Sequence, residues 1–258
     1  MAADVTLQAD DSALQDYLSR GGKLTSPEAA PPRYRGELMR LMATFVDSEL
    51  AGAAGFVDII NKGPGLNERR AAARIVMEKL ESADRVLQVM ADFGANTARY
   101  VATHPWEKRL ERYDDIGATR QPGDMRLNVF HYPIEGWADA VVMNVAQGRA
   151  SMIQLAEFAR CSYQPLADAF RDVLPVETRH TELGEQGLRA LVAGGQKGAA
   201  IAALDYWRPR VEVGFGQAQS SRFEMQQALG LRHETNAVLA ARWNEGLDAL
   251  LAELGLAS

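Results

Sequence analysis

Glu177 and His180 place a carboxylate and an imidazole three residues apart, a spacing that can serve metal chemistry. They lie in a segment with the apolar spacing of a long helix, where residues at i and i+3 leave one face about a turn apart. Both side chains can therefore converge on one metal ion in the core of a helical bundle. A solvated helix shows the same spacing by chance, so the hypothesis needs a second set of ligands.

A second acidic segment lies upstream. Glu49 belongs to a predicted amphipathic helix over residues 34–60 and is flanked by small residues that permit close packing. Residues 61–65 contain Gly and Pro and break this helix, and the next predicted helix, over residues 68–93, carries Glu78 and Glu81. Because a short connection makes two helices antiparallel neighbours, we expect Glu49 to face Glu78 and Glu81.

The rest of the chain supplies the elements that position these residues. Gly and Pro interrupt residues 104–134, which we expect to cross over to a second helical hairpin, over residues 135–161 and 162–192. Two further helices are predicted, one over residues 198–227 with interruptions near residues 207–209 and 214–216, and one over residues 231–254. Period-two alternation is nearly absent. The sequence therefore predicts an all-α four-helix bundle with additional terminal helices, as one domain of residues 34–258 after an extension of residues 1–33.

Composition excludes several classes of protein. The chain has 258 residues, 47% of them hydrophobic, which is enough for a large core. Its net charge of -6 argues against nucleic acid or an anionic membrane as the main partner. The single cysteine, Cys161, excludes an internal disulfide and fits a reducing compartment. Without a span-length apolar run or a signal-peptide pattern, we expect a soluble, cytoplasmic protein.

Other polar residues carry weaker signals. His104, His131 and His233 stand apart in loops or on helical surfaces, and we expect most of them to be ordinary polar residues. A basic group in residues 99–126 is a candidate for binding the phosphates of coenzyme A, although a solvated helix end and loop is the more common explanation for such a group. Its members are Arg99, Lys108, Arg109, Arg112, Arg120 and Arg126.

An ordered set of motifs resembles the phenylacetic-acid catabolic family over about residues 34–245. The motifs occupy residues 162–165, 177–184, 207–210, 215–216 and 230–236. The C-terminal part is more similar to the catalytic, epoxidase-type members of the family than to the non-catalytic ones. The resemblance implies a ferritin-like fold, a carboxylate-bridged di-iron centre, O2 activation, and epoxidation or hydroxylation of an aromatic or acyl-CoA substrate.

The resemblance places the metal ligands at Glu49, Glu78, Glu81, Glu177 and His180. The chain departs from the family pattern at Glu81, where the family has histidine, and at Gly148, where it has a carboxylate. Because an oxygen-rich ligand set favours harder ions, iron, manganese and no metal all stay open. Without a metal, the buried carboxylates would need cationic partners. The candidates for these partners are Arg74, Arg85, Arg149 and Arg179.

Two functions follow from these residues and from the resemblance. The first is an oxygenase component that takes electrons from a separate reductase, since no flavin or dinucleotide fingerprint is present. The alternative is a non-catalytic structural subunit with a degenerate metal site. Iron storage is disfavoured because family-like motifs continue into the terminal helices. Either function is expected to involve a homodimer or a hetero-complex.

Overall fold

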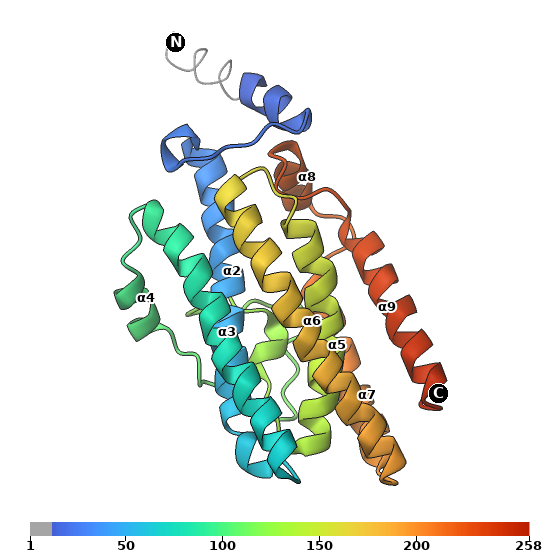
Figure 1. Ribbon diagram of the computed structural model, residues 1–258. Helices are drawn as coiled ribbons and strands as arrows, with labels where there is room; N and C mark the ends of the chain where they lie inside the picture. The colour runs from blue at the N-terminus through green and yellow to red at the C-terminus, as the bar shows by residue number, and fades with distance from the viewer. Residues whose placement is uncertain (1–11, 258) are drawn as a thin grey trace.

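A computed structural model describes residues 12–257, which fold into a bundle of long helices (Figure 1). The four longest are α2 (Pro32–Val57), α3 (Leu66–Asp92), α5 (Trp137–Phe158) and α6 (Gln164–Ala193). Within residues 12–257 there is one isolated bridge, between Leu24 and Tyr163, and no strand. The all-α prediction is therefore confirmed. None of the helices in this part of the chain has the length and apolar character needed to cross a membrane.

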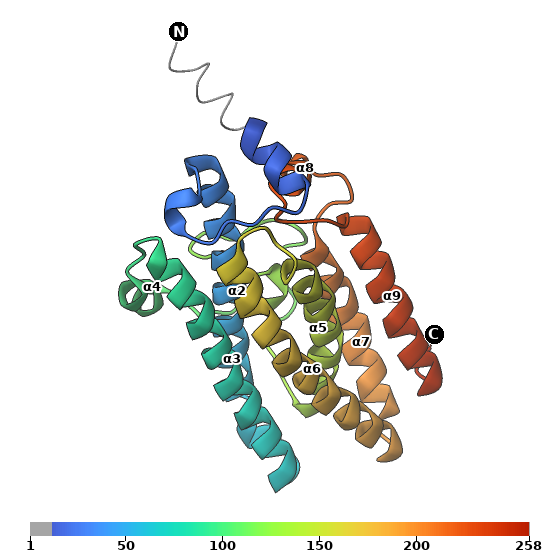
Figure 2. The same ribbon diagram turned by 45° about the horizontal axis from the view of Figure 1, so that its top comes forward.

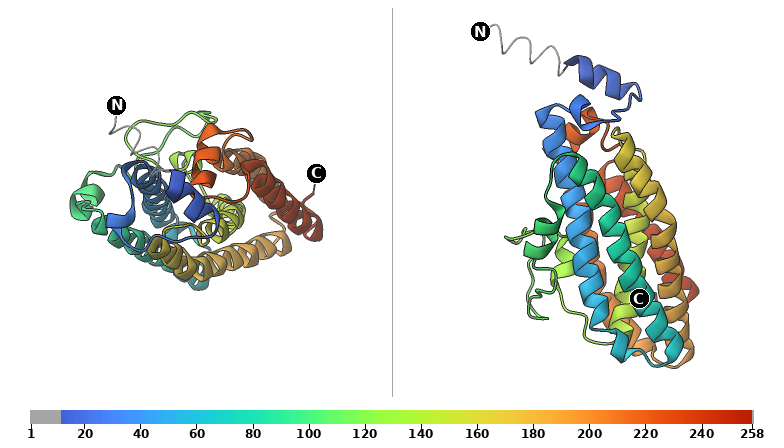
Figure 3. Two further views of the ribbon diagram at one scale, coloured as in Figure 1. Left: turned by 90° about the horizontal axis from the view of Figure 1, so that it is seen from above. Right: turned by 60° about the vertical axis from the view of Figure 1, so that its left-hand side comes forward.

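The four long helices form two antiparallel hairpins in a ferritin-like arrangement. Helix α2 packs against α3, α5 packs against α6, and α3 and α6 join the two hairpins (Figure 3). The first hairpin turns at residues 58–65: α2 ends at Val57, a short 3-10 helix η2 (Ile60–Lys62) follows, and Gly63, Pro64 and Gly65 separate it from Leu66, where α3 begins. The ends of the long helices agree with the predicted segments to within a few residues.

The connection between the hairpins runs along one flank of the bundle. It begins with α4 (Thr97–Thr103), continues as irregular chain, and contains a short 3-10 helix, η3 (Asn128–His131). Segment η3 contacts α2, and the right-hand view of Figure 3 shows the connection beside that helix. The predicted crossover is thus an ordered layer that covers α2.

The C-terminal part agrees with its prediction at one of the two expected interruptions. The helix predicted over residues 198–227 was expected to be interrupted near residues 207–209 and 214–216. The chain forms α7 (Lys197–Glu212), which continues through Pro209, then a 3-10 turn η4 (Val213–Phe215) at the second predicted interruption, and α8 (Ser221–Ala228). Gly216 has a φ of 83°, a left-handed conformation that ends the helical path. Helix α9 (Asn236–Glu253) then packs on the outside of α5, and α8 lies at the end of the bundle near residues 12–19 (Figure 2).

The bundle core consists of two apolar clusters. One cluster contains Val46 of α2 and Val86 of α3, and the other contains Phe56 and Ile75 of the same two helices. Helices α5 and α6 also contribute to both clusters. The charged residues of the predicted site fall between the two clusters along these helices. Their burial in this layer must be compensated by hydrogen bonds or opposite charges.

Candidate functional site

A lysine lies at the centre of the charged layer. The Nζ atom of Lys79 on α3 is 3.1 Å from Oε1 of Glu49 on α2 and 2.9 Å from Oε1 of Glu177 on α6. The three side chains expose 7%, 6% and 3% of their surface, respectively. One buried ammonium therefore joins carboxylates from two other helices.

The polar contacts continue outward through His180. Nδ1 of His180 is 3.1 Å from Oε1 of Glu177, and its Nε2 is 2.8 Å from Oε2 of Glu78. Each ring nitrogen of His180 therefore faces one carboxyl group, and the imidazole lies between two acidic side chains. Glu78 in turn lies 3.4 Å from a guanidinium nitrogen of the half-exposed Arg179. We call these residues the ion-pair chain: Glu49, Lys79, Glu177, His180, Glu78 and Arg179.

Opposite pKa shifts at the two central carboxyls follow from their different neighbours. Burial raises the pKa of Glu49 to about 7, against the pull of Lys79. Burial opposes ionisation of Glu177 as well, but Lys79 and His180 together outweigh it and lower the pKa of Glu177 to about 2. Burial disfavours charge on Lys79, yet Glu177 and Glu49 raise its pKa above the ordinary value. The ammonium and the Glu177 carboxylate are therefore the firmly charged pair.

The structure brings four of the five predicted ligands into this chain of contacts: Glu49, Glu78, Glu177 and His180. The fifth, Glu81, was placed wrongly, because its side chain is exposed on the outer side of α3. Two residues along a helix correspond to a rotation of about 200°, so Glu81 cannot share the inward face of Lys79.

Lys79 is the residue that the sequence analysis missed. The inward face of α3 consists of Ile75, Lys79, Ser82 and Val86, which are spaced four, three and four residues apart. This is the spacing of one buried helical stripe. The spacing therefore indicated that Lys79 faces the core, but this interpretation requires a lysine to be accepted as a buried residue.

Gly148 has no room for the carboxylate expected at its position. A Cβ atom added to this glycine would lie 2.4 Å from Oγ1 of Thr181 on α6. The close approach of α5 and α6 therefore requires glycine at this point. A longer side chain would have to push the two helices apart.

Only one of the four predicted arginine partners joins the ion-pair chain. Arg179 contacts Glu78, whereas Arg85 pairs with Asp172 and Arg149 pairs with Glu185. Arg74 is exposed on α3. Those three predictions were wrong because Arg74 and Arg85 are exposed on the bundle surface, and Arg149 is held in the contact with α9, where it donates to the Gly246 carbonyl.

The residues present do not fit a di-iron centre. The Lys79 ammonium already lies between Glu49 and Glu177, where a metal ion would need their carboxylates. Glu81 is exposed, and Gly148 offers neither a side chain nor space for one. The lysine supplies the positive charge that these carboxylates need in the absence of a metal. Iron or manganese at the five predicted ligands would require Lys79 to be displaced.

A pocket of about 400 Å³ lies between α2 and α5, next to the ion-pair chain. Glu49 and Gln147 line its inner part, and aromatic side chains form much of its wall: Phe45, Phe130, Phe158, Phe215 and Phe223. Three exposed arginines mark its open side: Arg40, Arg120 and Arg222. Burial and the neighbouring charges of Arg222 and Arg40 lower the pKa of Arg120. The arginines are therefore close enough to repel, and an anion would relieve that repulsion.

The fold and the site together define a ferritin-like helical bundle in which a lysine bridges the central carboxylates. The chain belongs to the phenylacetic acid catabolic protein family, whose model matches residues 14–258. This match confirms the family resemblance and assigns the chain to phenylacetate catabolism. A search of curated proteins found no match.

Proposed function

We propose that this chain is a non-catalytic subunit that assembles with a catalytic member of its family. The observation that carries the proposal is the position of Lys79, 3.1 Å from Glu49 and 2.9 Å from Glu177. Displacing this ammonium with a metal ion would leave a buried cation without its partners, which is strongly unfavourable. The bundle is thus stabilised by ion pairs at the place where a catalytic member needs metal ligands.

Three exposed apolar residues of α3, interspersed with the exposed charged residues Arg70 and Glu81, support assembly with another protein. Leu66, Met77 and Leu80 expose 73%, 60% and 38% of their surface, respectively. Their spacings of eleven and three residues place them on one side of the helix. Exposed apolar surface of this kind is typical of protein–protein contacts. We therefore propose that α3 contacts the catalytic partner subunit.

The pocket supports a second role, binding of an aromatic acyl thioester. Its phenylalanine wall suits an aromatic group, and Arg40, Arg120 and Arg222 suit the phosphates of coenzyme A. The same pocket is the observation that favours the competing oxygenase function, since it reaches Glu49. Of the basic residues predicted to bind phosphates, only Arg120 lines it.

Co-expression with a catalytic member of the family tests the assembly. Light scattering should show a complex of fixed stoichiometry, and Met77→Glu should dissociate it by placing a charge in the apolar contact. Val238→Glu is the matched control, because Val238 is also exposed, at 47%, but lies on α9. Retention of the complex by Met77→Glu would contradict the proposed interface.

Turnover separates the subunit from an oxygenase. The chain alone, supplied with Fe(II), a compatible reductase and phenylacetyl-CoA, should form no oxygenated product. The matched positive control is the catalytic partner under the same conditions. Product formed by this chain alone, and lost in Glu177→Gln, would overturn the non-catalytic assignment.

A further inference from the structure

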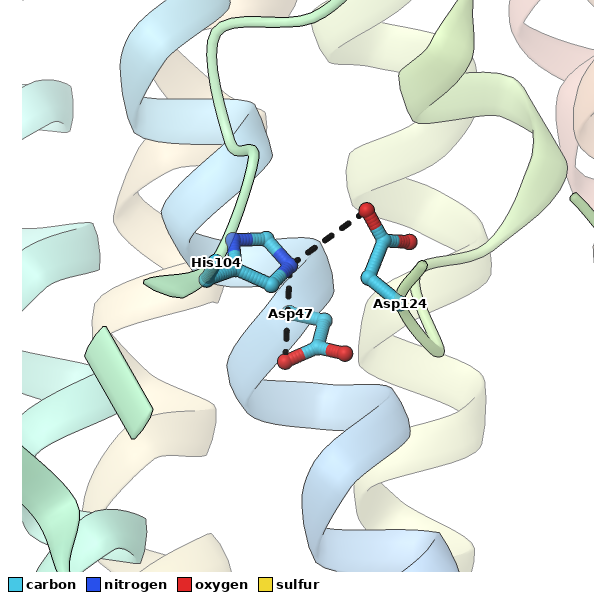
Figure 4. A group of neighbouring side chains, drawn as sticks. All are labelled: Asp47, His104 and Asp124. Carbon is cyan, nitrogen blue, oxygen red and sulfur yellow. Dashed lines mark ion pairs between the residues drawn. The ribbon is translucent and has the colours of Figure 1, made fainter. Parts of the chain in front are cut away.

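A second polar cluster lies outside the ion-pair chain, where the crossover covers α2. Asp47 comes from α2, His104 follows the end of α4, and Asp124 follows the turn at Gly123 (Figure 4). Their side chains expose 2%, 3% and 2% of their surface, respectively. Most of the lone histidines were expected to be ordinary polar residues of loops or helical surfaces, but His104 is buried, because the crossover encloses it.

The imidazole of His104 lies close to two carboxylates but forms no hydrogen bond with either of them. Its Nε2 lies 3.5 Å from Oδ1 of Asp47 and 3.5 Å from Oδ2 of Asp124 (Figure 4). Both of its ring nitrogens are buried and lack a hydrogen-bond partner. A buried imidazole without a partner carries an unfavourable desolvation free energy, so its orientation toward two carboxylates needs a further explanation.

We propose that Asp47, His104 and Asp124 bind a divalent first-row cation, with Zn²⁺ as the reference ion. Metal–nitrogen and metal–oxygen bonds of about 2.0–2.1 Å at a tetrahedral angle separate neighbouring ligand atoms by roughly 3.4 Å. The two observed separations of 3.5 Å match this spacing, and all three ligand atoms lie within 4.8 Å of one another. Three protein ligands leave the fourth position to water.

A protonated His104 would offer a different explanation, and the distances argue against it. Charge-assisted N–H···O bonds between imidazolium and carboxylate are about 2.7–2.9 Å long. The pairs of His180 with Glu78, at 2.8 Å, and with Glu177, at 3.1 Å, come much closer to that length. At 3.5 Å on both sides, His104 leaves the space that an interposed ion would fill.

Both carboxylates are oriented by groups outside the cluster, as ligating carboxylates generally are. Asp47 accepts hydrogen bonds from the Tyr100 hydroxyl at 2.5 Å and from the Met125 amide at 2.6 Å. Asp124 accepts from the backbone amide of Arg126 at 3.1 Å and from its Nε at 2.7 Å. These bonds fix the two oxygens that face His104.

The local charge also favours a cation. Arg126 is 1% exposed and balances one of the two carboxylates, while His131 lies beside Asp124 at 3.9 Å. The two carboxylates also repel each other, and a divalent ion placed between them would relieve that repulsion. The ion would tie α2 to two points of the crossover, so its expected role is to hold that layer against the bundle.

Metal titration of the untagged full chain tests this site. After treatment with a chelator, the wild type should bind one equivalent of Zn²⁺, measured by elemental analysis, and its melting temperature should rise. Co²⁺ in place of Zn²⁺ should give the intense visible absorption of a tetrahedral ion. His104→Gln, which keeps a polar side chain, should lose the equivalent, and Asp47→Asn should do so too.

Two control variants locate the ion. His233→Ala removes a histidine outside the cluster, and Glu177→Gln alters the ion-pair chain, so both should retain one equivalent. The far-UV circular dichroism of each metal-free variant establishes that it is folded. A wild type that binds no Zn²⁺, or a folded His104→Gln that still binds one equivalent, would overturn the proposal. Neither result would bear on the subunit assignment, which rests on Lys79.

Discussion

Lys79 and Glu177 face each other across the α3–α6 contact, with Nζ 2.9 Å from Oε1 and less than a tenth of either side chain exposed. The same ammonium also reaches Glu49 on α2. Three of the four bundle helices are therefore linked through one cation. Such a buried pair need not add more stability than apolar residues of equal size, but removing only one partner leaves an uncompensated charge.

Lys79→Met should destabilise the protein by about 3–5 kcal/mol, because Glu49 and Glu177 would lose their shared cation in the core. Urea unfolding followed by circular dichroism measures the change. The double variant Lys79→Met with Glu177→Gln should recover part of the loss. Arg85→Met is the control: it breaks an exposed pair with Asp172 and should cost at most about 1 kcal/mol. Equal losses in the two single variants would contradict the role of Lys79.

The raised pKa of Glu49 predicts a pH dependence of stability. Its pKa is about 7 in the folded protein and 4.5 as the unfolded reference, so the folded state binds more protons between these values. The free energy of unfolding should therefore fall as the pH rises from about 4.5 to 7. The pKa of Glu177 is shifted in the opposite direction, from 4.5 to about 2, so its effect on stability has the opposite sign. The stability that the ionised Glu177 contributes is complete above pH 4.5 and is lost as the pH falls toward 2.

Glu49→Gln separates these two effects. In this variant the free energy of unfolding should no longer fall between about pH 4.5 and 7. It should still fall in acid, below about pH 4.5, because Glu177 is unchanged. Denaturant unfolding at a series of pH values measures both regions. An unchanged slope in the upper window would show that a group other than Glu49 takes up the proton.

Gly148→Ala should destabilise the protein by about 1–3 kcal/mol through overpacking, because its Cβ would lie 2.4 Å from Oγ1 of Thr181. Gly198→Ala is the matched control in α7, where an added Cβ meets nothing within 4 Å. That change should be neutral or stabilising by up to about 1 kcal/mol. Thermal unfolding of both variants gives the comparison. A neutral Gly148→Ala would mean that the contact between α5 and α6 relaxes easily.

The sequence was most informative where apolar spacing sets the helices. The long helices followed from this periodicity, and Glu177 and His180 lie on one inward face as the i, i+3 rule requires. On α3 the family motif predicted Glu78 and Glu81 as metal ligands. Each of them lies one residue before a buried, inward-facing position, which is Lys79 or Ser82. One residue is about 100° of rotation, enough to exchange a buried side chain for an exposed one.

The cluster of Asp47, His104 and Asp124 could not be predicted from the sequence for a different reason. Asp47 lies on a helix, but His104 and Asp124 belong to irregular chain, whose path has no period to extrapolate. Their meeting depends on contacts of the crossover with α2, such as the bond from the Met125 amide to Asp47. A lone histidine in a Pro-containing segment gives no signal of such contacts.

The inward positions of α3 define a gain-of-function variant. Lys79→Glu combined with Ser82→His would place a carboxylate and an imidazole, three residues apart, on the buried face opposite Glu177 and His180. This variant should bind iron at the bundle centre after anaerobic reconstitution, whereas Glu81→His, on the exposed side, should not. Elemental analysis should show at least one iron more per chain than in the wild type, and Glu177→Gln should abolish that increment. Iron gained equally by Glu81→His would show that the inward face of α3 has been assigned to the wrong residues.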